Sequence, residues 1–180
     1  MELKGCHETI AFSIDGTTLA YGLDQQLVRL WNLESNTNVM LPRSHDVRSG
    51  DYAAFITAVA YSPDGIHLVV GCHVATIKFW NVADYSYTRK IHLGSGWSSV
   101  TLITFSPDAK QMACSSHGSQ IRMFQVENGA LVGLLVGHTA RVEALASNRN
   151  RNGRMMLVSG GCDRTIRFWD LPDVPPLNNE

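Results

Sequence analysis

The sequence predicts an all-β fold built from four copies of one antiparallel unit. Three observations point to it: one hexapeptide pattern occurs four times, a second string precedes three of those copies, and short strand-like segments alternate with turn signals. The 180 residues include 15 glycines and 6 prolines, which suits a chain that turns often. Because repeated units stack on one another, we expect each unit to cover its neighbours.

The hexapeptide pattern carries an aromatic residue at its fifth position. These aromatic anchors are spaced by 49, 44 and 45 residues, and they are Trp31, Trp80, Phe124 and Trp169. A Ser-x-Asp string stands about 18 residues before each of the first three anchors, at Ser13–Asp15, Ser62–Asp64 and Ser106–Asp108. The fourth unit has the longer polar run 147–154 in that place. Four copies in register make the pattern specific, whereas a single copy would carry no weight.

The second unit shows how one copy forms strands. Its predicted strands, in order, are residues 55–61, 67–71, 75–81 and 87–93. The turn between the first two contains Pro63, which fixes φ, and Gly65, which accepts a positive φ. The run 66–70 is almost continuously apolar, a pattern typical of a strand covered on both faces. The unit therefore predicts an antiparallel meander that lies between two other sheets.

On these residues the chain resembles the WD-repeat β-propellers. Its period fits the repeat of about 40–45 residues in that family, and the fourth unit carries both signature pairs, Gly137-His138 and Trp169-Asp170. The resemblance covers nearly the whole chain and implies four four-stranded antiparallel blades, a partial or unusually small propeller. The expected blades are residues 1–41, 50–93, 94–136 and 137–172, followed by a proline-rich tail at 173–180.

The sequence allows more than one way to close the ring of blades. An open row of four blades leaves two apolar end faces bare, a loss on the order of 10 kcal/mol. Half of the 6 prolines lie at 172–176, so we expect the fourth blade to lack its own fourth strand. Residues 1–5 look like the end of a fourth strand, and the family resemblance implies closure by such an N-terminal strand. Three alternatives follow: a fragment of a longer propeller, a ring of two copies, or a closed ring of four blades.

Composition excludes several classes of function. The net charge of -1 supplies no positive field for nucleic acid or for a membrane surface. No run approaches the roughly 18 apolar residues of a spanning helix, and the N-terminus has no signal-peptide pattern. The 4 cysteines stand far apart without a Cys-x-x-Cys pair, which predicts reduced thiols in an intracellular, cytoplasmic protein.

Three residues of the fourth unit, His138, Ser159 and Asp163, invite a serine-hydrolase interpretation. The family resemblance instead implies that they form a hydrogen-bonded structural tetrad with Trp169. Ser159 also lacks the Gly-x-Ser-x-Gly pattern of a nucleophile elbow, so we expect no catalytic residue and no enzyme. The other units depart from the tetrad. They carry Gln25, Val74 and Gly118 at the Asp163 position, and Tyr21, Val70 and Cys114 at the Ser159 position.

We expect no cofactor and no metal. The chain has no glycine-rich phosphate loop of the Gly-x-x-x-x-Gly-Lys type. His73 and His117 fall at the same turn of adjacent units, where the fourth unit has Cys162. That spacing matches no zinc-ligand pattern, so we interpret the two histidines as exposed turn residues.

Partner binding is expected on the loops that join fourth to first strands and second to third strands, because loops on a rigid scaffold carry recognition. Tryptophan, tyrosine and arginine dominate interface hot spots. The predicted partner-binding residues are Trp97, Tyr52, Arg48, Arg141 and Arg164. The alternative for Trp97 is that it packs between blades.

The sequence therefore predicts a non-catalytic scaffold that presents a loop face to a protein or peptide partner, an inference that rests on fold-level analogy. One alternative is a structural piece that completes a larger propeller or multi-domain assembly, including a signalling or ubiquitin-ligase-type adaptor. A homodimer, or association with further blades, would close the ring. The least favoured alternative is a hydrolase that uses Ser159, His138 and Asp163.

Overall fold

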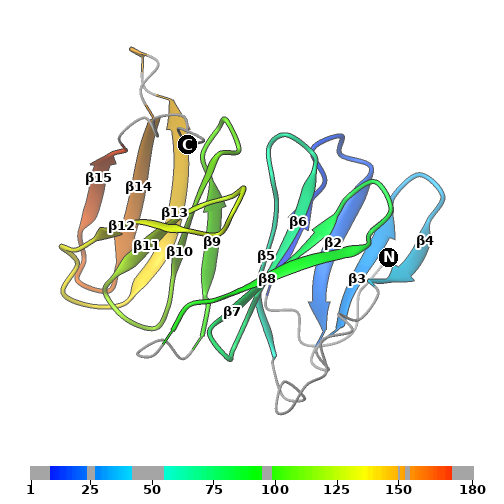
Figure 1. The fold of residues 1–180 in the computed structure, drawn as a ribbon, viewed down its shortest axis with the longest axis horizontal. Helices are drawn as coiled ribbons and strands as arrows, with labels where there is room; N and C mark the ends of the chain where they lie inside the picture. Colours follow the sequence, from blue (N-terminus) through cyan, green and yellow to red (C-terminus); the bar gives the residue numbers. More distant parts are fainter. Residues whose placement is uncertain are drawn as a thin grey trace, which may run out of the picture.

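The computed structural model describes residues 9–23, 27–41, 55–94, 99–149, 151–152 and 155–171. Within these ranges the chain forms fifteen strands in four antiparallel sheets, numbered I to IV in chain order. The sheets stand side by side in a row (Figure 1). The described ranges hold no helix with the length and apolar character that a membrane crossing requires.

Each of the first three sheets is a four-stranded meander. Sheet I contains β1 (Ile10–Phe12), β2 (Thr18–Leu23), β3 (Leu27–Asn32) and β4 (Thr37–Met40). Sheet II contains β5 (Ile56–Tyr61), β6 (His67–Cys72), β7 (Thr76–Asn81) and β8 (Tyr87–His92). Sheet III contains β9 (Leu102–Phe105), β10 (Gln111–Ser115), β11 (Ile121–Gln125) and β12 (Leu131–Leu135). Sheet IV contains β13 (Val142–Arg149), β14 (Met155–Gly161) and β15 (Ile166–Asp170).

The all-β prediction is confirmed, and the strands of the second unit begin and end within one residue of the predicted positions. Sheet IV has three strands in the described part of the chain, in agreement with the expectation that the fourth blade lacks its own fourth strand and in place of the four that the repeat implies. The prolines at 172–176 are the basis of that expectation, because proline has no N–H to donate to a strand ladder.

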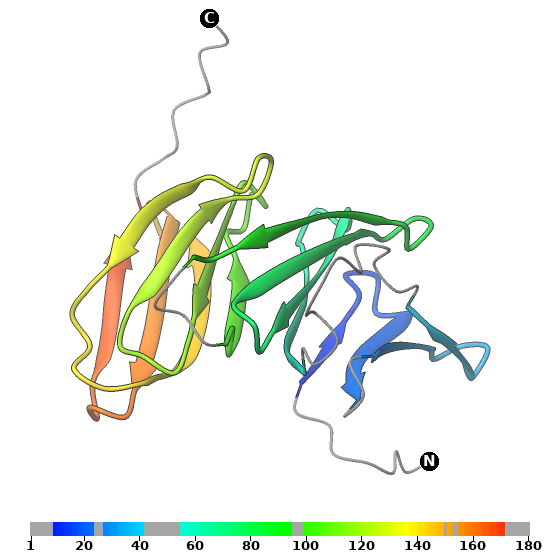
Figure 2. The same cartoon turned by 60° about the horizontal axis from the view of Figure 1, so that its bottom comes forward.

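Neighbouring sheets meet through their first strands. β5 of sheet II contacts β1 and β2 of sheet I, and it also contacts β9 of sheet III. β9 in turn contacts β13 of sheet IV. Sheets I and IV lie at opposite ends of the row (Figure 2). The described residues thus form an open arc of four sheets.

The Ser-x-Asp strings close the hairpins between the first and second strands. In sheets I to III the serine Oγ donates to the aspartate Oδ1 at 2.5–2.7 Å and accepts a backbone N–H five residues later at 2.8–2.9 Å. The aspartate also accepts the N–H two residues after it, at 3.0–3.1 Å. Two side chains therefore satisfy the polar groups of each tight turn. Sheet IV lacks the motif and has a longer hairpin.

The hydrophobic core is divided into three layers, each between two sheets. The layer between sheets I and II includes Ala20, Val28, Leu30, Leu41, Ile56, Val59, Leu68, Val70, Cys72 and Trp80. The layer between sheets II and III includes Val69, Ile77, Phe79, Val100, Phe105, Met112, Cys114 and Phe124. The layer between sheets III and IV includes Ala113, Ile121, Met123, Val142, Met155, Leu157 and Leu171. Alternate side chains of one strand enter opposite layers, so each inner sheet contributes to two of them.

The four aromatic anchors occupy the same position in their sheets. Trp31 pairs with Leu19, and the equivalent pairs are Leu68 with Trp80, Met112 with Phe124, and Leu157 with Trp169. In sheets II, III and IV the anchor packs into the layer shared with the preceding sheet. The common position confirms that the sequence repeat is a structural repeat.

Gly71 of β6 lies at a close approach between sheet II and the segment before β9. A Cβ atom added at Gly71 would meet Val100 Cγ1 at 2.7 Å. Val100 is fully buried and lies in the segment just before β9, the first strand of sheet III. The Val100 N–H donates to the Cys72 carbonyl at 3.1 Å, which joins the two sheets through their backbones. Glycine is needed here for close packing.

Candidate functional site

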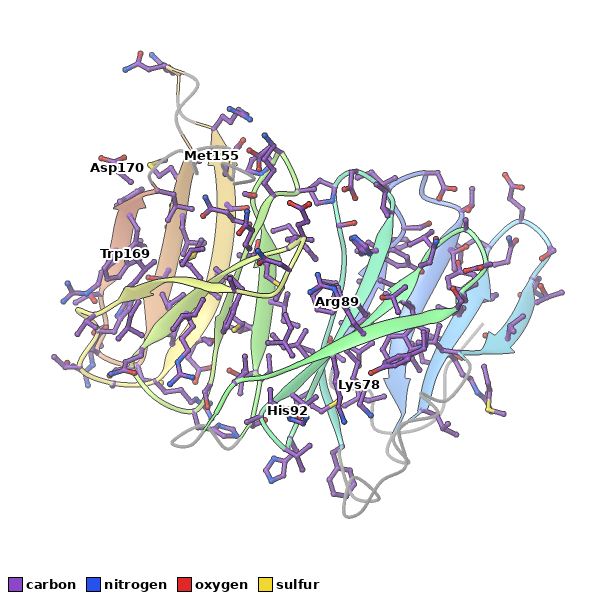
Figure 3. The ribbon with its side chains drawn as sticks, viewed as in Figure 1. Lys78, Arg89, His92, Met155, Trp169 and Asp170 are labelled. Atoms are coloured by element: carbon purple, nitrogen blue, oxygen red, sulfur yellow. The ribbon has the colours of Figure 1, made fainter. Side chains whose placement is uncertain are left out.

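Four side chains of the last unit form a continuous hydrogen-bonded network. Trp169 Nε1 donates to Ser159 Oγ at 2.8 Å, and Ser159 Oγ lies 2.8 Å from His138 Nε2. His138 Nδ1 lies 2.8 Å from Asp163 Oδ2. Trp169 stands on β15 of sheet IV, beside Asp170 (Figure 3). The structure therefore brings together the four residues that the sequence grouped as a tetrad.

The order Ser159, His138, Asp163 has the distances of a hydrolytic triad, but the serine is not accessible. Ser159 is only 1% exposed, and its Oγ is already hydrogen-bonded to both Trp169 and His138. The His138 side chain is also buried. A nucleophile must reach its substrate, so this geometry suits a network that satisfies buried polar groups.

Asp163 ties two loops together. Its Oδ2 accepts the N–H of Thr139 at 3.0 Å, from the loop before β13. Its Oδ1 accepts the N–H of Thr165 at 3.0 Å and the Thr165 hydroxyl at 2.7 Å, in the turn between β14 and β15. Burial on its own would raise the pKa of Asp163, but the hydrogen bonds from Thr165, the Thr139 N–H and His138 outweigh it and hold that pKa far below 3.8.

In the described part of the chain, sheets II and III lack this network, as the sequence predicted, whereas Gln25, the predicted counterpart of Asp163 in sheet I, lies outside the described residues. Strand pairing places Ser159 opposite Arg167, and Val70, Cys114 and Tyr21 stand opposite a basic residue in the same way. All three of these side chains are buried. Burial raises the pKa of the Cys114 thiol, which keeps it protonated. At this position sheets II and III place apolar side chains instead of the hydroxyl.

A polar cluster lies on the loop face directly outside the tetrad. We call it the loop cluster, and it contains His117, Arg141, Glu143, Cys162 and Arg164. The Arg141 guanidinium forms an ion pair with Glu143, and its Nη1 lies 3.5 Å from His117 Nδ1 of the preceding sheet. The Cys162 thiol donates to Glu143 Oε1 at 3.3 Å. That hydrogen bond raises the pKa of Cys162, which argues against a reactive thiolate.

The backbone holds the loop cluster in place. The Cys162 N–H donates to the Arg141 carbonyl at 2.8 Å, and the Val142 N–H donates to the Gly118 carbonyl at 3.2 Å. Arg164 adopts the left-handed conformation with φ at 64°, and its N–H donates to the Gly161 carbonyl at 3.0 Å. The equivalent residue in sheet II, Ala75, has φ at 52°. The turns of sheets II and IV therefore share this left-handed residue, which in sheet IV is an exposed arginine.

The structure places two of the five predicted partner-binding residues. Arg141 contacts Glu143 and His117, and Arg164 stands exposed in the turn two residues after Cys162, whereas Trp97, Tyr52 and Arg48 lie outside the described residues. Glu143 was not among the residues predicted from the sequence. A signal was available, because Glu143 carries the opposite charge to Arg141 and follows it by two residues.

His73 and Cys162 do not form a metal centre with His117 in this structure. Among the residues that the structure describes, no three His, Cys, Asp or Glu side chains come together in a way that could hold a metal ion. His73 and His117 are exposed turn residues, which confirms their predicted position.

Four meander sheets that meet through their first strands and share apolar layers are blades of a β-propeller. The family model "WD domain, G-beta repeat" matches residues 44–81 and 129–170. The chain is 28% identical over 156 residues to Protein groucho of Drosophila melanogaster. That match covers 86% of this chain and 20% of the relative. The resemblance to WD repeats that the repeated strings predicted is therefore confirmed at residues 44–81 and 129–170, and the chain spans about a fifth of the length of this curated relative.

A solved structure supports the same fold. A chain in a crystal structure of the mitotic checkpoint complex superimposes with a TM-score of 0.73 and 22% sequence identity. The match covers 91% of this chain and 46% of that chain. The likeness therefore establishes the fold of almost the whole chain, which corresponds to about half of the solved one.

Replacing Ser159 by alanine tests the role of the tetrad. The substitution leaves His138 Nε2 and Trp169 Nε1 without their shared partner, so we expect a loss of about 1–3 kcal/mol in the free energy of unfolding. Thermal unfolding should show a melting temperature lower by several degrees, about 2–4 °C for each kcal/mol. Ser119→Ala, in a loop of sheet III, is the control and should change it little. Loss of a hydrolytic activity with unchanged stability would instead support the serine-hydrolase interpretation.

The pKa of Asp163 predicts a dependence of stability on pH. A carboxylate with a lowered folded-state pKa stabilises the protein above its unfolded value of 3.8, and this contribution is lost as the pH falls toward the folded value. Asp163→Asn should therefore melt below the wild type at neutral pH, and the difference should shrink below about pH 4. Glu127→Gln, an exposed change, is the control. A difference that stays constant down to low pH would contradict the role of the ionised Asp163.

Proposed function

We propose that the protein is a non-catalytic scaffold that binds a protein or peptide partner through the loop cluster. The observation that supports this proposal is that the buried tetrad is hydrogen-bonded to the loops that carry the exposed loop cluster. Asp163 links the tetrad to both loops that bear Arg141 and Arg164. A partner that docks there would meet loops that are already ordered, which lowers the entropic cost of binding.

The chemistry of the loop cluster favours a partner with carboxylate groups. The Arg141 and Glu143 side chains are 47% and 45% exposed, so both can contact a partner. Glu143 neutralises Arg141, while Arg164 stands on its own turn with a guanidinium that can bind a carboxylate in bidentate fashion. Arginine is also among the residues that contribute most to interface affinity. We therefore expect the partner to present an acidic peptide segment.

The relatives support a protein partner. The solved chain that shares this fold belongs to a structure of a complex. The net charge of -1 gives no electrostatic reason to prefer nucleic acid or a membrane surface. We further propose an intracellular, cytoplasmic location, because Cys72, Cys114 and Cys162 are free thiols in the described part of the chain.

A second role is supported by the ends of the row. The outer faces of sheets I and IV carry exposed apolar side chains, including Phe12 and Phe168. Such faces are buried between neighbouring blades elsewhere in the chain. We therefore propose that the chain acts as part of a closed propeller, completed by further blades, rather than as an isolated arc.

A displayed peptide library tests the scaffold role. Peptides selected on the wild-type chain should lose about 10-fold or more in affinity for the double variant R141A/R164A, because both guanidinium groups contact them. Binding is measured by fluorescence polarisation on purified chain. Arg151→Ala, an exposed arginine in the hairpin between β13 and β14, should bind the same peptides as wild type does. Selected peptides that bind the double variant equally well would place the binding surface elsewhere.

A further inference from the structure

The outer face of sheet IV is the clearest unsatisfied surface in the described structure. Phe168 of β15 occupies the position of Leu30, Phe79 and Met123 in the third strands of the other sheets. Those three side chains are at most 3% exposed, because each enters the layer shared with the next sheet. Phe168 is 68% exposed. The same sequence position is therefore buried wherever a following sheet is present and bare where it is not.

The neighbouring position on β15 repeats the pattern. Ile166 corresponds to Val28, Ile77 and Ile121, which are all buried. Ile166 itself is 69% exposed. On the same face of sheet IV, Ala146 pairs with Val158 beside Phe168, and Ala144 pairs with Gly160 beside Ile166, so these two rows are apolar across three strands. It has the composition of an interior layer rather than of a solvated face.

Sheet I also exposes apolar side chains, on the face that points away from sheet II. Phe12 of β1 occupies the position of Phe105, and Ile10 occupies the position of Val59. Phe105 and Val59 are buried in layers shared with the preceding sheet. Phe12 and Ile10 are 60% and 61% exposed. Sheet I thus offers the half of an interface that a preceding sheet would cover.

The internal layers show how such halves fit together. Between sheets II and III, Phe79 of the earlier sheet packs in one cluster with Phe105 and Met112 of the later one. In every layer, the face that one sheet turns toward the C-terminal end of the row meets the face that the next sheet turns toward the N-terminal end. By the same rule, the face that carries Phe168 matches the face that carries Phe12. The two faces lie at opposite ends of the row, so one chain in this arrangement cannot join them (Figure 2).

We propose that sheet IV of one copy packs on sheet I of a second copy, and that two such contacts close a ring of two chains. This inference rests on the proposal that the end faces are covered by further blades, and it names the second copy as their source. One chain presents both halves of the interface, so a two-fold arrangement buries all four end faces with two identical contacts. A contact of this head-to-tail kind is stable as a discrete particle only if it closes.

Size and charge agree with a second copy. Two arcs supply eight blades, within the range of about four to eight found in propellers. This chain matches 46% of the solved propeller-containing chain, so two copies approach its length. The net charge of -1 for each copy opposes association only weakly.

Sedimentation equilibrium and light scattering across a wide concentration range test the ring. The wild-type chain should reach a mass twice 19.8 kDa and show no larger species. Phe168→Asp and Phe12→Asp should each raise the dimer dissociation constant about 100-fold, because each places a charge in both contacts. Both side chains are exposed in the single chain, so circular dichroism should show an unchanged fold. Leu131→Asp, an exposed apolar position on β12, is the matched control and should dimerise as wild type does.

Mixing the two variants gives the decisive arm. A pair of one Phe168→Asp chain and one Phe12→Asp chain retains one wild-type contact, so the mixture should form dimers more tightly than either variant does by itself. A wild-type chain that stays monomeric at all concentrations overturns the proposal and leaves further blades, from a longer chain or from another protein, to cover the end faces. A dimer that is insensitive to Phe12→Asp overturns the head-to-tail contact. Peptide binding by the monomeric Phe168→Asp chain would show that the loop cluster works whatever the outcome for the ring.

Discussion

Each apolar sheet face in this protein is buried only where another sheet lies against it. The strands of sheet II pair with one another, but Val70 is buried by sheet I and Phe79 by sheet III. Such a short-stranded sheet has no interior of its own, so stacking supplies the hydrophobic stabilisation that strand pairing cannot. The repeated hairpins and the aromatic anchors keep the sheets alike enough for one kind of interface to occur between every neighbouring pair.

Burial between stacked sheets also explains why the polar side chains of the tetrad form a closed hydrogen-bonded network. A sheet face between two blades excludes water, so a hydroxyl there must be fully hydrogen-bonded, and Ser159 is, through Trp169 and His138. Asp163 stands where this buried network meets the loops, and it fixes the turn that carries Arg164. The network therefore connects the packing of the last blade to the shape of the surface proposed to bind a partner.

The sequence predicts much of this fold because its signals are local. The Pro63–Gly65 turn and the position of Trp80 locate the strands of sheet II to within one residue. The prolines after Trp169 predict that the fourth blade has no fourth strand of its own, in agreement with the three strands in its described part. Long-range relations are less accessible. Phe79 and Phe168 look alike in the sequence, and only the presence of a neighbouring sheet makes one buried and the other exposed. The contact of Arg141 with His117 joins two blades and has no local signal. Partner binding by Trp97, Tyr52 and Arg48 stays a prediction.

Hydrogen exchange measured on the dilute chain tests most directly whether stacking between sheets governs stability. If it does, the amides of β6 and β10, which lie in sheets covered on both sides, should exchange about 100-fold more slowly than those of β1 and β15. Protection should fall from sheets II and III toward both ends of the row. Equal protection in all four sheets, or the strongest protection in sheet IV, would contradict the account.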